Sequence, residues 1–211
     1  MGGICCDASV STVDELMQAI ADAEAAVTGP SRTICLATGT YVLPPGPANE
    51  IHQVHLMNGE TLLGAGKGLT ILRGAGPDAA RTALWTESYF ETVHLRGLTI
   101  TNGFGLSGGG IINQGFLALT DCDVSSNGAS QGGGIWSRPY ADDEVACDLT
   151  LTRCDITGNV ATTDAQTGRG GGIYNDGPLT VDNCNISGNS SDQGNNCFLD
   201  SDSQLTGTCP A

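Results

Sequence analysis

Three copies of one sequence pattern, all between Gly108 and Asn189, decide the fold of this chain. They read GGGIINQGFLALTDCDVSSN from residue 108, GGGIWS…CDLTLTRCDITGN from residue 132 and GGGIYNDGPLTVDNCNISGN from residue 170. Each copy contains a glycine triplet, an isoleucine, a short alternating strand, a cysteine, a second short strand and an asparagine. Self-similarity of this kind predicts a solenoid of stacked structural repeats.

The spacing of the copies indicates one coil length of 24 residues with two insertions. The isoleucines that follow the glycine triplets, Ile111, Ile135 and Ile173, are 24 and 38 residues apart. The difference is accounted for by 8 additional residues within Arg138–Ala146 and 6 within Thr162–Arg169. Insertions into a regular coil predict loops at the corners of a solenoid.

Apolar residues alternate within each short strand, as in Leu117 and Leu119 and then in Cys122 and Val124. A period of two places such residues on one face of a strand. A coil of 24 residues is also too short for a pair of helices with their turns. The glycine triplets suit corners where the backbone needs positive φ. We therefore predict an all-β solenoid, a parallel β-helix.

The repeats resemble those of a known family. GGGI followed by Val124-Ser-Ser-Asn127, Ile156-Thr-Gly-Asn159 and Ile186-Ser-Gly-Asn189 is similar to the GGxI and FxxN repeats of polymorphic outer membrane proteins, with an aliphatic residue in place of the phenylalanine. More broadly, residues 34–189 resemble right-handed parallel β-helix repeat proteins of the pectate-lyase-like superfamily. The resemblance implies a right-handed, single-stranded parallel β-helix, and the superfamily includes polysaccharide lyases and glycosidases.

The whole chain, residues 1–211, is predicted to form a single β-helix domain, with its coils in residues 32–190. Thr12-Val-Asp-Glu15 is a capping box, and apolar residues at helical spacing follow it. We expect a helix over residues 12–28 that covers the N-terminal end of the core, because a solenoid needs a terminal cap. Residues 191–211 are expected to form a C-terminal cap.

Aligning Gly68-Leu-Thr-Ile71 and Gly97-Leu-Thr-Ile100 with the three later copies predicts continuous columns of side chains through five coils. One inward column contains Leu69, Leu98, Cys122, Cys154 and Cys184; its neighbour contains Ile71, Ile100, Val124, Ile156 and Ile186. An outward column contains Thr70, Thr99, Asp123, Asp155 and Asn185. The three cysteines are expected to be buried as small apolar side chains.

Residues 43–54 are expected to begin as a loop because of their prolines, which places the pair His52 and His55 in or beside a loop.

Nine cysteines are a high number for a reducing compartment. Six of them lie near the termini or in loops. We predict disulfides between Cys197 and Cys209, and between Cys35 and one of Cys5 or Cys6, with Cys6 as the candidate. No run of about 20 apolar residues is present, so we predict no membrane span, and no signal peptide is visible. These features predict an extracellular or cell-surface location.

The net charge of −15 argues against nucleic acid and anionic membranes as partners. Per-repeat insertions on a solenoid often form its binding edge. The candidate ligand-binding residues are therefore those in and beside the first insertion: Trp136, Arg138, Tyr140, Asp142, Asp143 and Glu144. Asp123 and Asp155, one coil apart, are candidate ligands for Ca²⁺, since stacked carboxylates repel each other and can recruit a cation.

The sequence favours a non-catalytic structural or adhesive module with a polysaccharide or surface partner, and with end-to-end or lateral self-association as a further option. The alternative is a Ca²⁺-dependent, lyase-like, polysaccharide-active enzyme. The glycosidase signatures of the superfamily, such as Gly-His-Gly and Arg-x-Lys, are absent, and the single lysine, Lys67, forms no positive groove for an anionic polymer.

Overall fold

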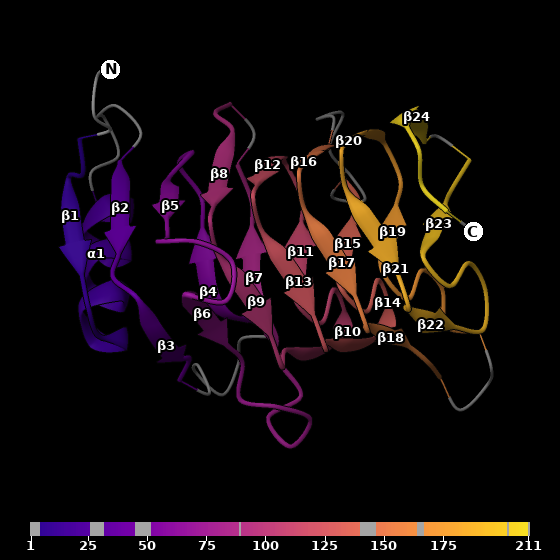
Figure 1. The fold of residues 1–211 in the computed structure, drawn as a ribbon, viewed down its shortest axis with the longest axis horizontal. Coiled ribbons are helices and arrows are strands. Elements are labelled where there is room, and N and C mark those ends of the chain that lie inside the picture. Colours follow the sequence, from indigo (N-terminus) through magenta and orange to yellow (C-terminus); the bar gives the residue numbers. More distant parts are fainter. Residues whose placement is uncertain are drawn as a thin grey trace.

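The computed structural model describes residues 5–25, 32–44, 52–88, 90–139, 147–163, 167–201 and 203–210. Within these residues the chain forms an all-parallel β-solenoid of about six turns, with one short helix near the N-terminus (Figure 1). The predicted class, a parallel β-helix with a short N-terminal helix, is confirmed. No helix in the described ranges is long and apolar enough to cross a membrane.

Four parallel sheets, here called A to D, form the sides of the solenoid in the described residues. Sheet A contains β1 (Ala8–Val10), β2 (Thr33–Leu36), β5 (Thr61–Leu63), β8 (Val93–Arg96), β12 (Phe116–Thr120), β16 (Asp148–Thr152), β20 (Pro178–Asp182) and β24 (Gln204–Gly207). Sheet B contains β3 (Gly39–Val42), β6 (Thr70–Arg73), β9 (Thr99–Thr101), β13 (Asp123–Ser125), β17 (Asp155–Thr157) and β21 (Asn185–Ser187). Sheet C contains β4 (His52–Leu56), β7 (Thr82–Thr86), β11 (Ile111–Asn113), β15 (Ile135–Ser137), β19 (Ile173–Asn175) and β23 (Cys197–Leu199). Sheet D contains β10 (Phe104–Ser107), β14 (Gly128–Gln131), β18 (Val160–Ala161) and β22 (Ser190–Ser191).

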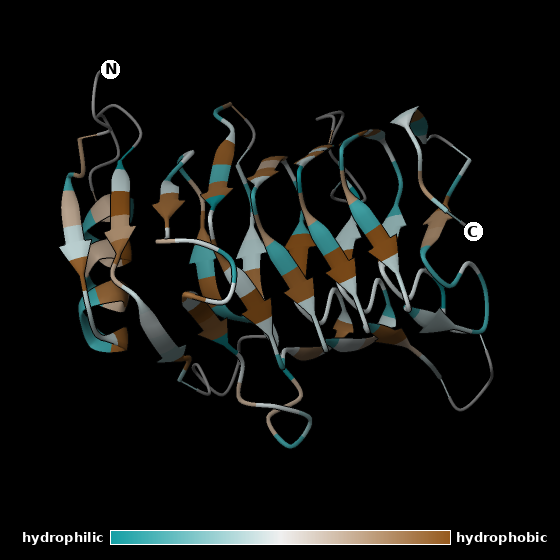
Figure 2. Ribbon diagram, viewed as in Figure 1, coloured by the Kyte–Doolittle hydropathy of each residue, from teal (hydrophilic) through white to brown (hydrophobic). Residues whose placement is uncertain are grey.

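The register predicted for the three repeat copies is confirmed. Val124 in β13 lies beside Ile100 on one side and Ile156 on the other. Leu117 and Leu149 pair in the same way on sheet A. These side chains are fully or almost fully buried, and the apolar bands of successive coils lie next to each other in Figure 2. The core is therefore a set of continuous apolar columns, as the alternating pattern predicts.

The predicted register is wrong by one residue in the coil that contains residues 68–73. β6 pairs with β9 so that Leu72, not Ile71, lies beside Ile100. Leu72 is fully buried, whereas Leu69 is 55% exposed. Thr70, which was expected to face outward, is fully buried.

The burial of Thr70 has a local cause. Its hydroxyl donates a hydrogen bond to the carbonyl of Ala37 (3.1 Å) and accepts one from the amide of Ala65 (3.0 Å). A hydroxyl that both donates and accepts a hydrogen bond can be buried at little cost in folding free energy. As a result Ile71 occupies the ladder position that Thr99 holds in the next coil, so the four-residue motif is shifted by one position between the two coils.

A ladder of buried asparagines runs through the corner between sheets B and D. The side-chain oxygen of Asn159 accepts hydrogen bonds from the backbone amide and the side-chain amide of Asn127, both at 3.0 Å. Asn189 accepts the equivalent pair from Asn159, also at 3.0 Å. Asn127 in turn accepts from the amide of Gly103 (2.9 Å), and the amide of Asn159 donates to Val124 O (2.8 Å). This ladder explains why asparagine ends each repeat: both ends of its amide are used inside the core.

The helix α1 (Val13–Ala25) packs over the N-terminal end of the core. Its predicted capping box is present, because the amide of Glu15 donates to Thr12 Oγ1 and the amide of Thr12 donates to the Glu15 carboxylate, both at 3.2 Å. Leu16 and Ile20 are buried in the core cluster. The last three residues of the predicted helix, 26–28, lie outside the described ranges.

Both predicted disulfides are present. Cys6 pairs with Cys35 and Cys197 pairs with Cys209, with Cα–Cα distances of 5.7 and 6.0 Å. The first joins the segment just before β1 to β2 of the next coil. The second joins β23 to the segment after β24, and these two strands extend sheets C and A beyond the third repeat copy.

The prediction that Cys122, Cys154 and Cys184 are all buried is correct for the first two only. Cys184 is partly exposed. It precedes β21, the last strand of sheet B in the described chain, so no further coil of that sheet covers it. The backbone amide of Cys154 donates to Cys184 Sγ at 3.2 Å, which shows that the column itself is in register.

We expect a thiol reagent to label the folded protein in a fixed order, measured by mass spectrometry of peptides over time. The exposed Cys5 reacts first. Cys184 follows slowly, because its contact with the Cys154 thiol raises its pKa and lowers its thiolate fraction. Cys122 and Cys154 react only on unfolding, since both are at least 99% buried. Labelling of either buried thiol as fast as Cys184 would contradict the register of this column.

Candidate functional site

The two insertions of the repeat border the same sheet. The first connects β15 of sheet C to β16 of sheet A, and the second connects β18 of sheet D to β19 of sheet C. The outer face of sheet C therefore lies between them. Two candidate ligand-binding residues, Trp136 and Arg138, lie on this face or at its edge. The other four, Tyr140, Asp142, Asp143 and Glu144, lie outside the described residues.

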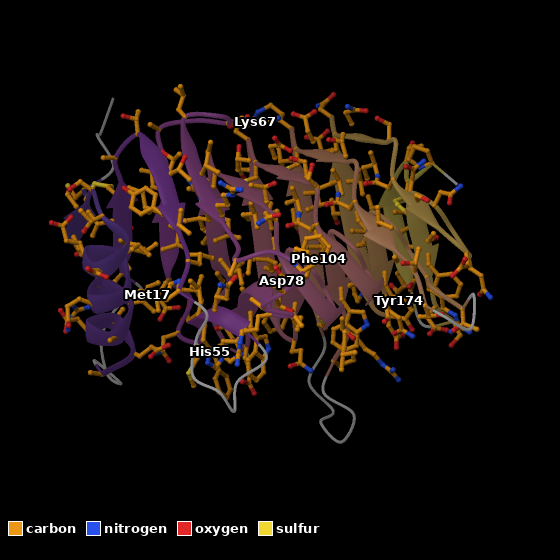
Figure 3. The ribbon with its side chains drawn as sticks, turned by 90° about the horizontal axis from the view of Figure 1, so that it is seen from below. Met17, His55, Lys67, Asp78, Phe104 and Tyr174 are labelled. Carbon is orange, nitrogen blue, oxygen red and sulfur yellow. A yellow bond between two sulfur atoms is a disulfide. The ribbon has the colours of Figure 1, made fainter. Side chains whose placement is uncertain are left out.

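The outer face of sheet C carries a column of mostly aromatic side chains, one from each coil. In register, the column consists of His55, Trp85, Ile112, Trp136, Tyr174 and Phe198. His55 stacks on Trp85 with ring centroids 4.4 Å apart, and Tyr174 stacks on Phe198 at 5.4 Å. Figure 3 shows His55 and Tyr174 on one side of the solenoid and Lys67 on the other.

The rings of this column stack in two groups, His55 with Trp85 and Trp136 with Tyr174 and Phe198, and Ile112 separates the two groups. The planes of Trp136 and Tyr174 are inclined by 20° with centroids 6.3 Å apart, and those of Tyr174 and Phe198 by 11°. Near-parallel rings at about the spacing of the coils cover each other's faces. Ile112 and Tyr174 are almost fully buried, whereas Trp136 and Phe198 are partly exposed. A partner that approaches sheet C from outside therefore meets mainly the ring edges of the partly exposed members, so this column stabilises the coils and offers a narrow apolar ridge rather than a flat stacking platform.

Polar groups fix the C-terminal part of the ridge. Arg138 Nε lies 3.1 Å from the Asp176 carboxylate. Tyr174 donates its hydroxyl to the Asp200 carboxylate (2.5 Å), and burial together with that carboxylate raises the pKa of Tyr174 to about 12. The Arg169 guanidinium lies 5.0 Å from the centre of the Phe198 ring, within cation–π distance. The ridge thus has an ordered rim with two arginines from the two insertions.

His52 and His55 lie in the strand β4, so of the two expected placements, in a loop or beside one, the first is wrong. The run of prolines ends before them, and β4 pairs with β7 from its first residue. His52 packs edge-on against Trp85 with centroids 4.7 Å apart. His55 Nε2 is 3.4 Å from the Glu87 carboxylate. Both imidazoles therefore belong to the N-terminal end of the aromatic column.

Asp123 and Asp155 face outward from sheet B, in register in adjacent coils. Asp155 accepts a hydrogen bond from Lys67 Nζ at 2.7 Å, although Lys67 lies 88 residues earlier in the chain. Burial opposes the charge of Lys67, but the hydrogen bond to Asp155 and the negative charges of Asp155 and Asp121 together outweigh it, so the pKa of the ammonium group is raised. Burial raises the pKa of Asp123, and the neighbouring charge of Asp155 adds to the shift.

A second ion pair lies on the same surface, where Arg153 makes two hydrogen bonds of 2.8 and 2.7 Å to the Asp121 carboxylate. The protein thus supplies its own cations to Asp155 and Asp121. Among the residues that the structure describes, no group of three or more histidine, cysteine or acidic side chains could hold a metal ion. Ca²⁺ normally takes six to eight oxygen ligands, and the pair Asp123–Asp155 offers two carboxylates, one of them already bound to Lys67.

The sequence contained a signal for the aromatic column that its periodicity alone does not reveal. The residue after each GGGI isoleucine is Ile112, Trp136 or Tyr174, which is large and apolar although it faces outward. The sequence did not reveal that both insertions adjoin sheet C, because this depends on the order in which each coil contributes strands to the four sheets.

Comparison with known proteins assigns no family: no family model matches the chain, and no curated protein matches it in sequence.

Proposed function

We propose that this chain is a non-catalytic structural or adhesive β-helix module of the extracellular space or cell surface, which binds a carbohydrate or another surface partner across sheet C. The observation that carries the proposal is the convergence of both insertions on one face, over an apolar ridge with the ordered rim of Arg138 and Arg169. Insertions confined to one side of a solenoid are typical of its binding surface.

The rest of the chain supports this reading. Two disulfides are compatible with an oxidising, extracellular setting. The net charge of −15 disfavours polyanionic partners. The resemblance of the repeats to those of polymorphic outer membrane proteins and of the pectate-lyase-like superfamily also favours a surface-exposed β-helix.

One observation favours a second candidate, a Ca²⁺-dependent polysaccharide-active enzyme. Asp123 lies beside Asp155 with a raised pKa, as a carboxyl group that donates a proton needs. The Lys67 ammonium on Asp155 argues against a bound Ca²⁺ at the same oxygen atoms. The two candidates therefore differ in the face they use, sheet C or sheet B.

The test compares two variants on a glycan array with and without Ca²⁺, together with an absorbance assay for uronate elimination. Deleting residues 139–146 shortens the first insertion to the length found in the first repeat copy. We expect it to weaken binding about tenfold or more while costing about 1 kcal/mol or less of stability, because the loop ends already meet. The double variant Asp123→Asn and Asp155→Asn leaves sheet C untouched and should bind as the parent does.

Other outcomes would favour the enzyme or narrow the binding proposal. Loss of polymer cleavage in the double variant, with the deletion still active, would establish the enzyme. Unchanged binding in the deletion would remove the first insertion from the site. An array on which the parent binds no glycan would restrict the proposal to a structural role or a non-carbohydrate partner. Far-ultraviolet circular dichroism of each variant verifies that the solenoid is intact.

A further inference from the structure

We propose that sheet D carries a second binding site, a shallow groove that accepts one or two residues of an uncharged saccharide. The groove has a volume of about 260 Å³ and crosses strands β10, β14 and β18. Its lining includes Phe104, Gly105, Gly128, Ser130, Val160 and Thr162. The surface is distinct from sheet C, although Thr162 also begins the second insertion.

The position of the Phe104 ring is built into the sheet. Phe104 pairs with Gly128 in the next coil, and a Cβ atom at Gly128 would lie only 2.6 Å from Phe104 Cε1 and 2.8 Å from Cδ1. The absence of a side chain at Gly128 therefore allows the ring to pack down onto the neighbouring strand. The ring remains partly exposed there and lines the groove.

The opposite wall is Val160, which pairs with Gly128 from the other side and is 40% exposed. The Phe104 ring covers the position of the missing Gly128 side chain, so the ring and Val160 flank the groove from neighbouring coils. Together the aromatic ring and the aliphatic side chain offer an apolar surface on which the C–H face of a sugar ring can pack, since C–H groups are attracted to aromatic rings.

The groove also contains hydroxyl groups that are available to a ligand. The side chains of Ser130 and Thr162 line it and make no hydrogen bond to any described residue, although the backbone amide of Thr162 is bonded to Ala129 O (3.0 Å). Each hydroxyl can donate and accept one hydrogen bond at low cost. Apolar walls with a few convergent polar groups are the usual composition of a small-molecule site.

The charge pattern indicates that the saccharide is neutral. None of the four strands of sheet D contains a charged residue. The chain as a whole carries −15, which repels uronates and sulfated sugars. An apolar protein segment or a second copy of this chain fits less well, because it would bury the two hydroxyls without partners, and a second copy would add the same net charge.

The test begins with an array of neutral gluco-, manno-, galacto- and xylo-oligosaccharides, with oligogalacturonates as charged controls. The best neutral ligand is then titrated calorimetrically against the parent, Phe104→Ala and Leu106→Ala. Phe104→Ala is expected to weaken binding about tenfold, the effect of losing one aromatic contact. Leu106→Ala is the matched control: Leu106 is on the same strand, is 82% exposed and does not line the groove, so its removal should change the affinity less than about twofold.

Three results would overturn this proposal: no neutral glycan is bound, Phe104→Ala binds like the parent, or Leu106→Ala weakens binding as much as Phe104→Ala. The last result, accompanied by self-association in sedimentation velocity, would mean that sheet D contacts a second copy instead. The variant lacking residues 139–146 separates this site from that on sheet C. Binding that is lost in the deletion and retained in Phe104→Ala belongs to sheet C and leaves the first proposal standing.

Discussion

Replacing Asn159 with alanine is expected to lower the free energy of unfolding by about 3–5 kcal/mol, which is a large part of the stability of a typical domain. Asn159 is fully buried, and its amide group bonds to Asn127, Asn189 and Val124. Alanine removes all of these bonds. The backbone amide of Asn127 and the carbonyl of Val124 then lose these partners in a region closed to water, and each buried group left unsatisfied costs roughly 1–3 kcal/mol.

The measurement is a urea titration followed by circular dichroism. Asn185→Ala is the matched control, because Asn185 is exposed on the outer face of the neighbouring strand β21 and should change stability by less than about 0.5 kcal/mol. If Asn159→Ala cost no more than Asn185→Ala, the ladder would be a consequence of the fold and not a contributor to its stability.

Leu16→Asp is expected to cost about 4 kcal/mol or more and to expose the first coil to self-association. Leu16 lies on the inner face of α1 and is fully buried against the N-terminal end of the core. Removing its side chain alone should cost about 2–5 kcal/mol, and a carboxylate at the same position adds the penalty of a buried polar group. With α1 displaced, the open edge of β1 becomes available to pair with another strand.

Urea titration gives the stability of Leu16→Asp, and sedimentation velocity gives its oligomeric state. Ala21→Asp introduces the same carboxylate on the exposed side of the same helix and should leave both quantities nearly unchanged. A Leu16→Asp protein as stable and as monomeric as Ala21→Asp would show that α1 does not function as a cap.

The sequence predicted the fold well wherever copies of the repeat could be compared. The coil length, the columns through Val124 and Leu117, the capping box of α1 and both disulfides follow from spacing and residue type. The prediction failed in the coil of residues 68–73, because a threonine hydroxyl with two partners occupies an inward position there. The strand β1, which opens sheet A, was not predicted, since its three residues carry no sign of the repeat.

The candidate site was only partly predictable. Trp136 and Arg138 stood out because they adjoin an insertion. The neighbours that define their surroundings, Tyr174, Phe198 and Asp176, become neighbours only when coils stack in register. The hydrogen bond from Lys67 to Asp155 joins residues 88 positions apart in the chain, and no local sequence pattern predicts it.

The asparagine ladder has a direction, and this direction bears on how the chain acquires its structure during synthesis. The amide of Gly103 is satisfied by Asn127, that of Asn127 by Asn159 and that of Asn159 by Asn189, so in each step the acceptor belongs to the following coil. When the chain emerges with its N-terminus first, the backbone amides of each coil lack their asparagine acceptors until the next coil has folded onto it. Folding of the ladder therefore advances one coil behind emergence, and its last step is the bond from the Asn189 side chain to Asn196 (3.1 Å), where the repeat ends.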